Sequence, residues 1–383
     1  MPPVWNNQAH HVLLVCTNLN NQGVETHAVH FARACREQGT ACTLAAHPDG
    51  FIARLARRHN VPVIPLKIGA AADLWGMLSL WRLLRRHRFD VLLGSDAREF
   101  LPIVLAGWLA GVSTFLFRHV NHSLKRAEAW TFSRLITAFL PVSVFTQGVL
   151  VRGGVPAHKA PVLYNPISTL PMPSCLAWRQ QIRALLDLQE DAVLVGFVGS
   201  LREYKGSFLL ADALNRAMSN APNLYVLWIG PEAEREAVRQ AIDSHHQSRH
   251  QWLGWQLDVQ PYYAAMDLLA VPSLVDEAFG RVSIEAQACG TPVFANQTAG
   301  GLPETLSDGL SGRLLPPDAS AWASALAEFA SQPSTTRSKQ RRATQQWVDE
   351  HFSPRVVIAE FHRLIAHSSL AQGPVLHAQT LPK

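Results

Sequence analysis

Short apolar runs alternate with stretches of helical period along nearly the whole chain, and this alternation constrains the fold more than any other feature. The first half contains six such runs, at residues 11–16, 41–46, 61–66, 90–94, 114–117 and 141–144. The stretches between them carry apolar residues at helical spacing, as in 24–39, which ends in a glycine cap. Runs that alternate with helices predict a parallel sheet wrapped by helices.

A second series follows a proline-rich bridge at residues 165–174, where no period is visible. Its runs are residues 192–200, 224–230, 251–254, 268–273, 291–295 and 312–316. A chain of 383 residues is long enough for two domains of ordinary size. We therefore expect an α/β protein of two Rossmann-like, doubly wound parallel-sheet domains that face a central cleft.

The bridge sets the expected domain boundaries. Residues 1–165 form the first domain and residues 166–350 form the second. The chain has helical character from about residue 318. Residues 351–383 are expected to form a C-terminal helix that packs back on the first domain, followed by a frayed tail.

Composition limits the classes of protein to which the chain can belong. Apolar residues make up 48% and charged residues 16%, which predicts globular domains rather than disorder. The net charge of +5 suits an anionic partner: nucleic acid, a membrane surface or a phosphorylated substrate. The 5 cysteines are scattered without a Cys-x-x-Cys, and the N-terminal residues show no secretory signal. Both observations favour a reducing, cytoplasmic setting.

Residues 101–117 carry no charge and are the best candidate for a membrane span. Their length is at the lower limit for a span. Gly111 divides the stretch, and β-branched and aromatic residues follow it. A buried helix followed by a buried strand therefore fits this segment better.

Charged residues lie beside glycines in the loop after the run 192–200. Arg202 and Lys205 stand between Gly199 and Gly206. Ligands of doubly wound sheets collect where the strands end, and two cations beside flexible backbone suit a diphosphate. The alternative is a solvated turn that precedes a helix.

The segment 276–290, DEAFGRVSIEAQACG, follows another run of the second series and contains two glutamates eight positions apart. A helix that begins near Gly280 would offer its first amides to phosphate oxygens. Glu285, on the second turn, would then suit ribose hydroxyls, and Glu277 would suit a second polyol. Alternatively, both acids only favour the positive end of a helix.

The longer segment 272–317 resembles the donor-binding signature of retaining glycosyltransferases of family 4, which have the GT-B fold. That signature contains E-x7-E, G-x-P-V, G-G-x-x-E and D-G-x-x-G-x-L, in this order. The matching residues are Glu277, Glu285, Gly290, Pro292, Val293, Gly300, Gly301, Glu304, Asp308, Gly309, Gly312 and Leu314. Further similar stretches are residues 21–44, 163–167 and 259–273.

The resemblance implies roles for individual residues. Glu285 would bind the nucleotide ribose, and Glu277 would contact the donor sugar. Lys205 matches the family's phosphate-binding lysine, His119 matches a histidine near the reacting carbon, and Arg202 completes the expected catalytic set. The remaining donor-binding positions are Gly23, Ser200, Phe279, Gly280, Arg281 and Val282.

The chain departs from the family pattern in three places. Ser200 stands where the family has an arginine directly after the glycine, and Arg202 follows two residues later. Gln22 precedes Gly23 where Gly-Gly is usual. Residues 90–97 lack the histidines that are common after the fourth strand, which indicates a different acceptor.

Histidine pairs three residues apart raise a metal site as an alternative, at His119 and His122 and at His27 and His30. A histidine with a purely structural role is a further alternative. No Asp-x-Asp occurs, so the usual carboxylate pair for a bridging cation is absent. We therefore expect no metal and no cofactor, with the leaving diphosphate neutralised by cations and helix-end amides.

The implied reaction moves a sugar, with retention, from a nucleotide-diphosphate sugar to a hydroxyl of a glycan or lipid-linked acceptor. Bacterial cell-surface polysaccharide or lipopolysaccharide synthesis is the expected context, with the acceptor on the first domain. Residues 74–88 place Trp75, Leu78, Trp81 and Leu84 on one helical side among arginines, which suits an anionic membrane surface. The alternative is an ordinary helix packed on the sheet.

Other classes of protein remain as rivals. A GT-B epimerase or phosphorylase shares the fold, although no lysine is marked for a pyridoxal cofactor. A non-catalytic nucleotide-sugar-binding protein is favoured only by Ser200. A nucleic-acid binder is suggested only by the basic charge, since no recognised module occurs, and nucleic acid is not an expected partner.

Overall fold

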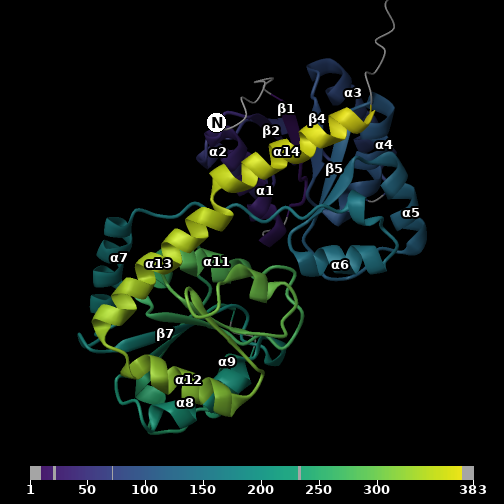
Figure 1. Cartoon of the computed structure of the whole chain (residues 1–383). Coiled ribbons are helices and arrows are strands. Elements are labelled where there is room, and N and C mark those ends of the chain that lie inside the picture. Colours follow the sequence, from purple (N-terminus) through teal and green to yellow (C-terminus); the bar gives the residue numbers. More distant parts are fainter. Residues whose placement is uncertain (1–9, 20–22, 71, 232–233, 373–383) are drawn as a thin grey trace, which may run out of the picture.

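The computed structural model describes residues 10–19, 23–70, 72–231 and 234–372, and it contains two parallel sheets of six strands each. Figure 1 shows the two sheets in separate halves of the molecule, each wrapped by helices. The expected fold class is therefore confirmed. The expected tail at 373–383 lies outside the described residues, and the last helix reaches Gln372.

The first sheet has the strand order β3-β2-β1-β4-β5-β6. Its strands are β1 (His11–Val15), β2 (Ala41–Ala46), β3 (Val63–Pro65), β4 (Val91–Gly94), β5 (Ser113–Arg118) and β6 (Ala138–Pro141). The helices around it are α1 (Gly23–Glu37), α2 (Phe51–Arg58), α3 (Leu74–His87), α4 (Phe100–Ala110), α5 (Arg126–Leu135) and α6 (Val144–Arg152). We call this unit the N-terminal domain.

The second sheet repeats this topology with the order β12-β11-β10-β7-β8-β9. Its strands are β7 (Val193–Val198), β8 (Leu224–Ile229), β9 (His250–Leu253), β10 (Leu268–Val271), β11 (Val293–Asn296) and β12 (Gly312–Leu315). Its helices are α7 (Met172–Leu185), α8 (Ser207–Met218), α9 (Arg235–Gln240), α10 (Gln260–Ala265), α11 (Arg281–Ala288), α12 (Ala319–Ser331) and α13 (Ser334–Phe352). We call this unit the C-terminal domain.

Successive residues of the central strands enter different cores because side chains alternate across a strand. In β1, Val12 and Leu14 pack with α1 on one face of the sheet. Leu13 and Val15 pack on the other face with α3 and α4. Both faces are covered, which explains why these strands read as continuous apolar runs.

The uncharged stretch 101–117 is divided as expected. Helix α4 ends at Ala110, its C-cap Gly111 has a φ of 68° in the left-handed region, and β5 follows. Among the helices that the structure describes, none is both long and apolar enough to cross a membrane.

The prediction of a strand at residues 141–144 is wrong. The strand is β6, which ends at Pro141, and the chain turns directly into α6. Ser143 caps α6, since its hydroxyl accepts a hydrogen bond from the Thr146 amide at 3.0 Å. Val142 and Val144 flank this cap, and their alternation with Ser143 resembles the pattern of a strand.

The interpretation of residues 74–88 as a helix with one tryptophan-lined side is also wrong in part. The buried residues of α3 are Gly76, Leu80 and Leu84, and Trp81 packs beside them. Trp75 lies off this face and is 78% exposed. The helix therefore packs on the sheet and presents one tryptophan outward.

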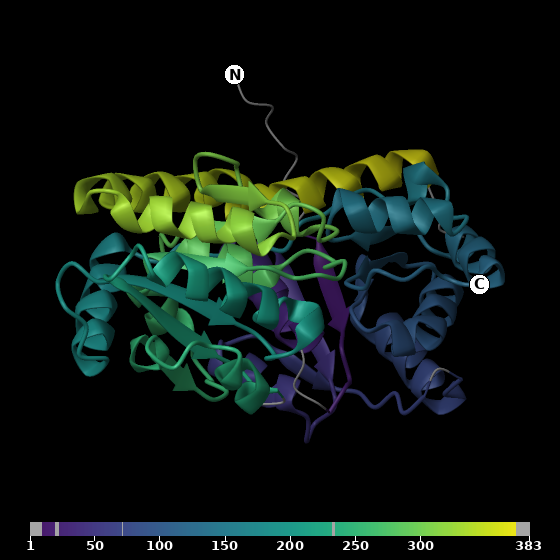
Figure 2. The same cartoon turned by 90° about the horizontal axis from the view of Figure 1, so that it is seen from below.

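The chain crosses between the domains twice. Residues without helix or strand between Lys159 and Met172 make the first crossing. The second lies at Ser353, where α13 gives way to α14 (Pro354–Gln372). Figures 1 and 2 show these two helices following one another along one side of the molecule. Helix α14 inserts Val357, Ile358, Phe361 and Ile365 into the core of the N-terminal domain.

Candidate functional site

A cavity of about 340 Å³ opens at the point where the strand order of the second sheet reverses, between β7 and β10. In doubly wound sheets this is where ligands bind. The N-terminal domain and the crossing segment contribute His119, Val142 and Asn165. The C-terminal domain contributes Phe197, Val198, Gly199, Lys205, Ala270, Val271, Pro272, Ser273, Glu277, Ala278, Phe279, Gly280, Arg281 and Val282. The cavity is therefore built by both domains.

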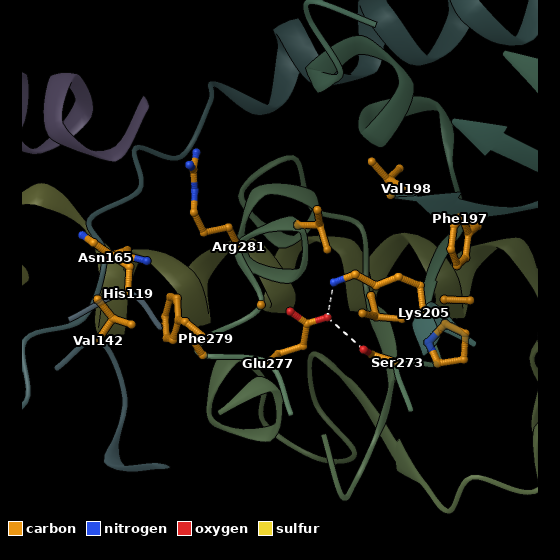
Figure 3. A pocket seen from close by; sticks show the side chains of 17 residues that line it. His119, Val142, Asn165, Phe197, Val198, Lys205, Ser273, Glu277, Phe279 and Arg281 are labelled. Atoms are coloured by element: carbon orange, nitrogen blue, oxygen red, sulfur yellow. Dashed lines mark hydrogen bonds and ion pairs between the residues drawn. The ribbon is translucent and has the colours of Figure 1, made fainter. Parts of the chain in front are cut away.

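Two of the expected site residues meet in this cavity. The Lys205 ammonium lies 2.6 Å from Oε1 of Glu277, and the Ser273 hydroxyl donates to the same oxygen at 2.8 Å. Figure 3 shows this pair at the centre of the pocket. Both side chains remain partly exposed, at 30% for Lys205 and 21% for Glu277. A ligand can therefore reach the cation and the carboxylate together.

Gly206 explains how Lys205 comes so close to the end of β10. Its φ is +77°, and a Cβ at this position would lie 2.0 Å from the Pro272 carbonyl oxygen. Only a residue without a side chain permits this approach of the two loops. The glycine noted in the sequence thus brings Lys205 to the strand end that precedes Glu277.

The helix expected after Gly280 is present as α11. Gly280 occupies its N-cap with φ +88°, and no side chain caps this end. The first amides of a helix have no carbonyl partner within the helix, so they are available to an anion. Arg281 and Val282 supply these amides, and both residues line the cavity.

Glu285 lies one turn further along α11 and is not among the residues that line the cavity. Its carboxylate is 2.8 Å from the Arg281 guanidinium and accepts a hydrogen bond from the Tyr263 hydroxyl at 3.3 Å. Arg281 also donates to Thr26 of α1 at 2.6 Å. This arginine thus joins the acid of one domain to the first helix of the other.

His119 follows β5 and faces the same cavity. Burial, together with the positive charge of Arg281, lowers the pKa of His119 to about 3. The ring of His27 lies 4.3 Å away between centroids, and burial holds its pKa well below the usual value. Both imidazoles are therefore neutral at pH 7, and His119 offers a hydrogen-bonding ring without a charge.

The histidine pairs considered as a metal site do not assemble one. In the described part of the chain, one group of three residues has ligand atoms close enough to share an ion: Asp243, His245 and His246. None of these residues lines the cavity. That the reaction needs no metal ion stays a prediction.

Two other expected residues lie apart from the cavity lining. Arg202 is 48% exposed and lies 4.0 Å from Glu234, and Ser200 is outside the lining. Gly23 begins α1, but residues 20–22 and the surroundings of Gly23 lie outside the described part of the chain, so its expected contact is not tested. The structure therefore assembles His119, Lys205, Glu277 and the start of α11, and leaves the other positions around them.

Sequence reasoning missed several contacts. Ser273 ends a predicted strand, and nothing in its spacing marks it as a partner of Glu277. Asn165 lies in the stretch 163–167, whose resemblance was noted without a role, and its buried Oδ1 has no partner among the described groups. Thr26 could have been found only from the packing of α1 against α11.

Glu304, in the G-G-x-x-E turn, joins the two domains. Its carboxylate accepts hydrogen bonds from the amides of Val144 and Phe145, at 2.7 and 2.9 Å, at the start of α6. The Tyr164 hydroxyl donates to it at 3.1 Å. Burial and this carboxylate raise the pKa of Tyr164 to about 12, so the phenol stays protonated. A negative charge at a helix N-terminus is favourable, and here it comes from the other domain.

Comparison with known families agrees with this architecture. Residues 21–169 match the family model Glycosyltransferase Family 4, and residues 179–347 match Glycosyl transferases group 1. HepE of Anabaena, solved with UDP and glucose, is 21% identical and aligns over 93% of this chain and 99% of its own, with a TM-score of 0.73. The chain has the GT-B glycosyltransferase fold. A glycosyltransferase of Rickettsia africae gives a TM-score of 0.80 at 18% identity, over 94% and 99% of the two chains.

Curated relatives match a shorter segment of this GT-B protein. A D-inositol 3-phosphate glycosyltransferase of Mycolicibacterium gilvum is 37% identical over 171 residues, or 41% of this chain and 36% of the relative. A second from Mycolicibacterium smegmatis is 39% identical over 159 residues, or 39% of this chain and 35% of the relative. The matches thus span little more than a third of these relatives. Of the resemblance inferred from residues 272–317, the matches to the two family models and the GT-B fold are confirmed.

Proposed function

We propose that the chain is a retaining glycosyltransferase that moves a sugar from a nucleotide-diphosphate sugar to an acceptor hydroxyl without a metal ion. The observation that carries this proposal is the convergence of Lys205, Glu277 and the start of α11 on one cavity that faces His119 of the other domain. The ligands named for HepE, UDP and glucose, support a nucleotide sugar as the donor. The names of the curated relatives support transfer rather than binding alone.

The chemistry breaks the bond between the anomeric carbon and the leaving phosphate oxygen and forms a bond from that carbon to the acceptor oxygen. The acceptor proton passes to the leaving phosphate, so no protein base is required. Lys205 and the first amides of α11 stabilise the charge that develops on the diphosphate. Glu277 binds donor-sugar hydroxyls, and neutral His119 donates or accepts a hydrogen bond near the reacting carbon. Enclosure by two domains limits hydrolysis of the donor.

We expect Glu285→Ala to weaken binding of UDP or UDP-glucose about 10- to 100-fold, because a carboxylate that accepts ribose hydroxyls is lost. The measurement is titration calorimetry on the wild type and the variant. Glu328→Ala is the matched control, since its carboxylate pairs with Arg313 on the surface, at 58% exposure. If the wild type and both variants bound the nucleotide equally, the proposed ribose contact of Glu285 would be wrong, and the residue would serve only to hold Arg281 and Tyr263.

The same assays separate transfer from its rivals. We expect nucleotide sugars to raise the melting temperature, and donor turnover to continue in excess chelator. Activity lost on chelation and restored by a divalent ion would contradict the metal-free mechanism. A thermal shift without turnover on any acceptor would favour a non-catalytic binding protein, and the absence of any shift would contradict the donor site itself.

We further propose that the N-terminal domain rests on an anionic membrane, where a lipid-linked or lipopolysaccharide acceptor is presented. Exposed tryptophans on three consecutive helices support this: Trp75 on α3 is 78% exposed, Trp108 on α4 57% and Trp130 on α5 60%. The last turn of α3 adds Arg85 and Arg86. Tryptophans beside arginines suit the interface of an anionic bilayer.

Binding to vesicles tests this surface. We expect the protein to co-sediment with phosphatidylglycerol vesicles in low salt and not with phosphatidylcholine vesicles. Trp75→Ser combined with Trp108→Ser should reduce the bound fraction several-fold. Trp255→Ser is the control, because Trp255 is 59% exposed but lies in the C-terminal domain. Equal binding of the control and the double variant would exclude this face.

A further inference from the structure

A second cavity, of about 570 Å³, lies in the N-terminal domain. It opens where β1 and β4 of the first sheet end, at the reversal of strand order that corresponds to the donor cavity of the second sheet. Its charged and hydroxyl-bearing lining includes Thr17, Lys67, Asp73, Asp96, Arg98 and Glu99. None of these residues belongs to the donor cavity.

Glu99 is the most unusual residue of this lining, because its side chain is buried and only half satisfied. The residue is 4% exposed. Oε1 accepts hydrogen bonds from the amide and the hydroxyl of Thr17, both at 2.8 Å. Oε2 is buried and has no partner among the described groups. A buried polar atom without a partner costs free energy, so this oxygen is a natural contact for a ligand.

Burial raises the pKa of Glu99 to about 7. Near neutral pH the carboxyl group is therefore present in both forms. Its protonated form donates a hydrogen bond, whereas its ionised form accepts one. A hydroxyl group can satisfy either form, because it both donates and accepts. A phosphate dianion has only acceptors, so it can satisfy only the protonated form.

The charges around Glu99 also disfavour an anion. Asp96 pairs with Arg98 at 2.7 Å, which leaves this arginine little free charge for a ligand. Asp73 accepts from the amides of Gly69 and Gly76 at 2.8 Å each, and these bonds hold its pKa below the usual value. Three carboxyl groups thus share the lining with Lys67, Arg98 and His47.

Two observations connect the second cavity with the donor cavity. The Asp96 charge acts on His119, since it partly offsets the lowering of the His119 pKa. Thr17, at the end of β1, lines the second cavity, and the helix that follows this strand places Thr26 against Arg281 of the donor cavity. A charge in the lining of the second cavity therefore acts on the histidine that faces the donor cavity.

We propose that this cavity is the acceptor subsite and that Glu99, held by Thr17, selects an uncharged, polyhydroxylated acceptor such as a sugar ring over its phosphorylated counterpart. The inference rests on the proposed glycosyltransferase function and specifies its acceptor. It differs from the phosphorylated acceptor in the name of the curated relatives, which match less than half of this chain. The acceptor oxygen bonds to the donor carbon, and its proton leaves with the diphosphate.

Saturation-transfer NMR on the full chain tests the proposal with two matched pairs of probes, methyl glucoside against glucose 6-phosphate and myo-inositol against inositol 3-phosphate. We expect the uncharged member of each pair to bind at least about tenfold more tightly in the presence of UDP. This comparison uses the wild-type protein and does not depend on the folding of a variant. Tighter binding of the phosphorylated members would overturn the proposal.

Glu99→Gln provides the second arm, because the amide keeps an oxygen for Thr17 but cannot ionise. We expect a roughly tenfold higher KM for the uncharged acceptor, with nearly the same affinity for UDP. The discrimination against the phosphorylated acceptor should increase more between pH 6 and pH 8 in the wild type than in the variant, because Glu99 becomes ionised over this range only in the wild type. Glu37→Gln, on the outer face of α1, is the control. An unchanged KM in Glu99→Gln would refute the role of Glu99. A wild-type protein that does not bind UDP would instead refute the donor site.

Discussion

Lys205→Ala is expected to lower the turnover number for donor hydrolysis and transfer roughly 100- to 1000-fold. The Lys205 ammonium is the cation closest to Glu277 in the donor cavity, and Gly206 holds its loop against the end of β10. Without it, the charge that develops on the leaving diphosphate loses this ammonium and keeps only the amides of α11 and the guanidinium of Arg281. The measurement is steady-state kinetics with UDP-glucose, together with the melting temperature of the variant.

Two further variants make this result interpretable. Lys205→Arg keeps the charge and should recover part of the activity, because an arginine also binds phosphate oxygens. Lys339→Ala removes an exposed lysine of α13 and should leave turnover within about twofold. If Lys205→Ala and Lys339→Ala had the same activity and stability, the proposed role of the donor cavity in diphosphate stabilisation would be wrong.

Glu304→Ala is expected to slow transfer about 100-fold while nucleotide affinity stays nearly unchanged. Glu304 is a positioning residue, since its carboxylate binds the amides of Val144 and Phe145 in the opposite domain. Its loss removes both amide contacts at the start of α6 and leaves the bond from the Ser143 hydroxyl to the Ala278 carbonyl, at 2.6 Å, to hold this end on the C-terminal domain. His119 and Glu277 then no longer keep a fixed separation across the donor cavity. The measurement is the turnover number beside the calorimetric affinity for UDP.

Tyr164→Phe is the matched variant for Glu304, because it removes one of the three hydrogen bonds to this carboxylate and leaves both amide bonds intact. We expect its turnover number to fall less than about fivefold. Small-angle scattering should give a larger radius of gyration for Glu304→Ala than for Tyr164→Phe. A Glu304→Ala protein with wild-type turnover and scattering would show that other contacts alone hold the domains together.

The sequence predicted most of the sheets because parallel strands covered on both faces are continuous apolar runs. Residues 41–46 and 224–230 became strands with nearly these bounds. The failure at 141–144 has a local cause. Apolar residues continue past Pro141, the last residue of β6, into the start of α6, so the end of the strand has no marked boundary. Ser143 is a helix cap that the pattern did not separate from a strand.

The site was predictable where its residues are close in sequence. Glu277, Gly280 and Glu285 form one local pattern, and α11 begins where that pattern placed it. The partners of these residues come from distant segments, and no spacing could identify them. Glu304 was noted only as part of a turn, whereas its function depends on an amide 160 positions earlier in the chain. Such a contact exists only after both domains have folded.

Helix α14 has a consequence for how the protein is made. Phe361 packs against Phe31 and Phe115, with ring centroids 5.3 and 6.2 Å apart, inside the first domain to be synthesised. While a ribosome is still translating the second domain, the first lacks these aromatic contacts, and the apolar side of α1 that receives them stays uncovered. Domains usually fold as they emerge. Here we expect the first domain to reach its final stability only after α14 has emerged from the ribosome, so chaperones would have a long interval in which to bind it.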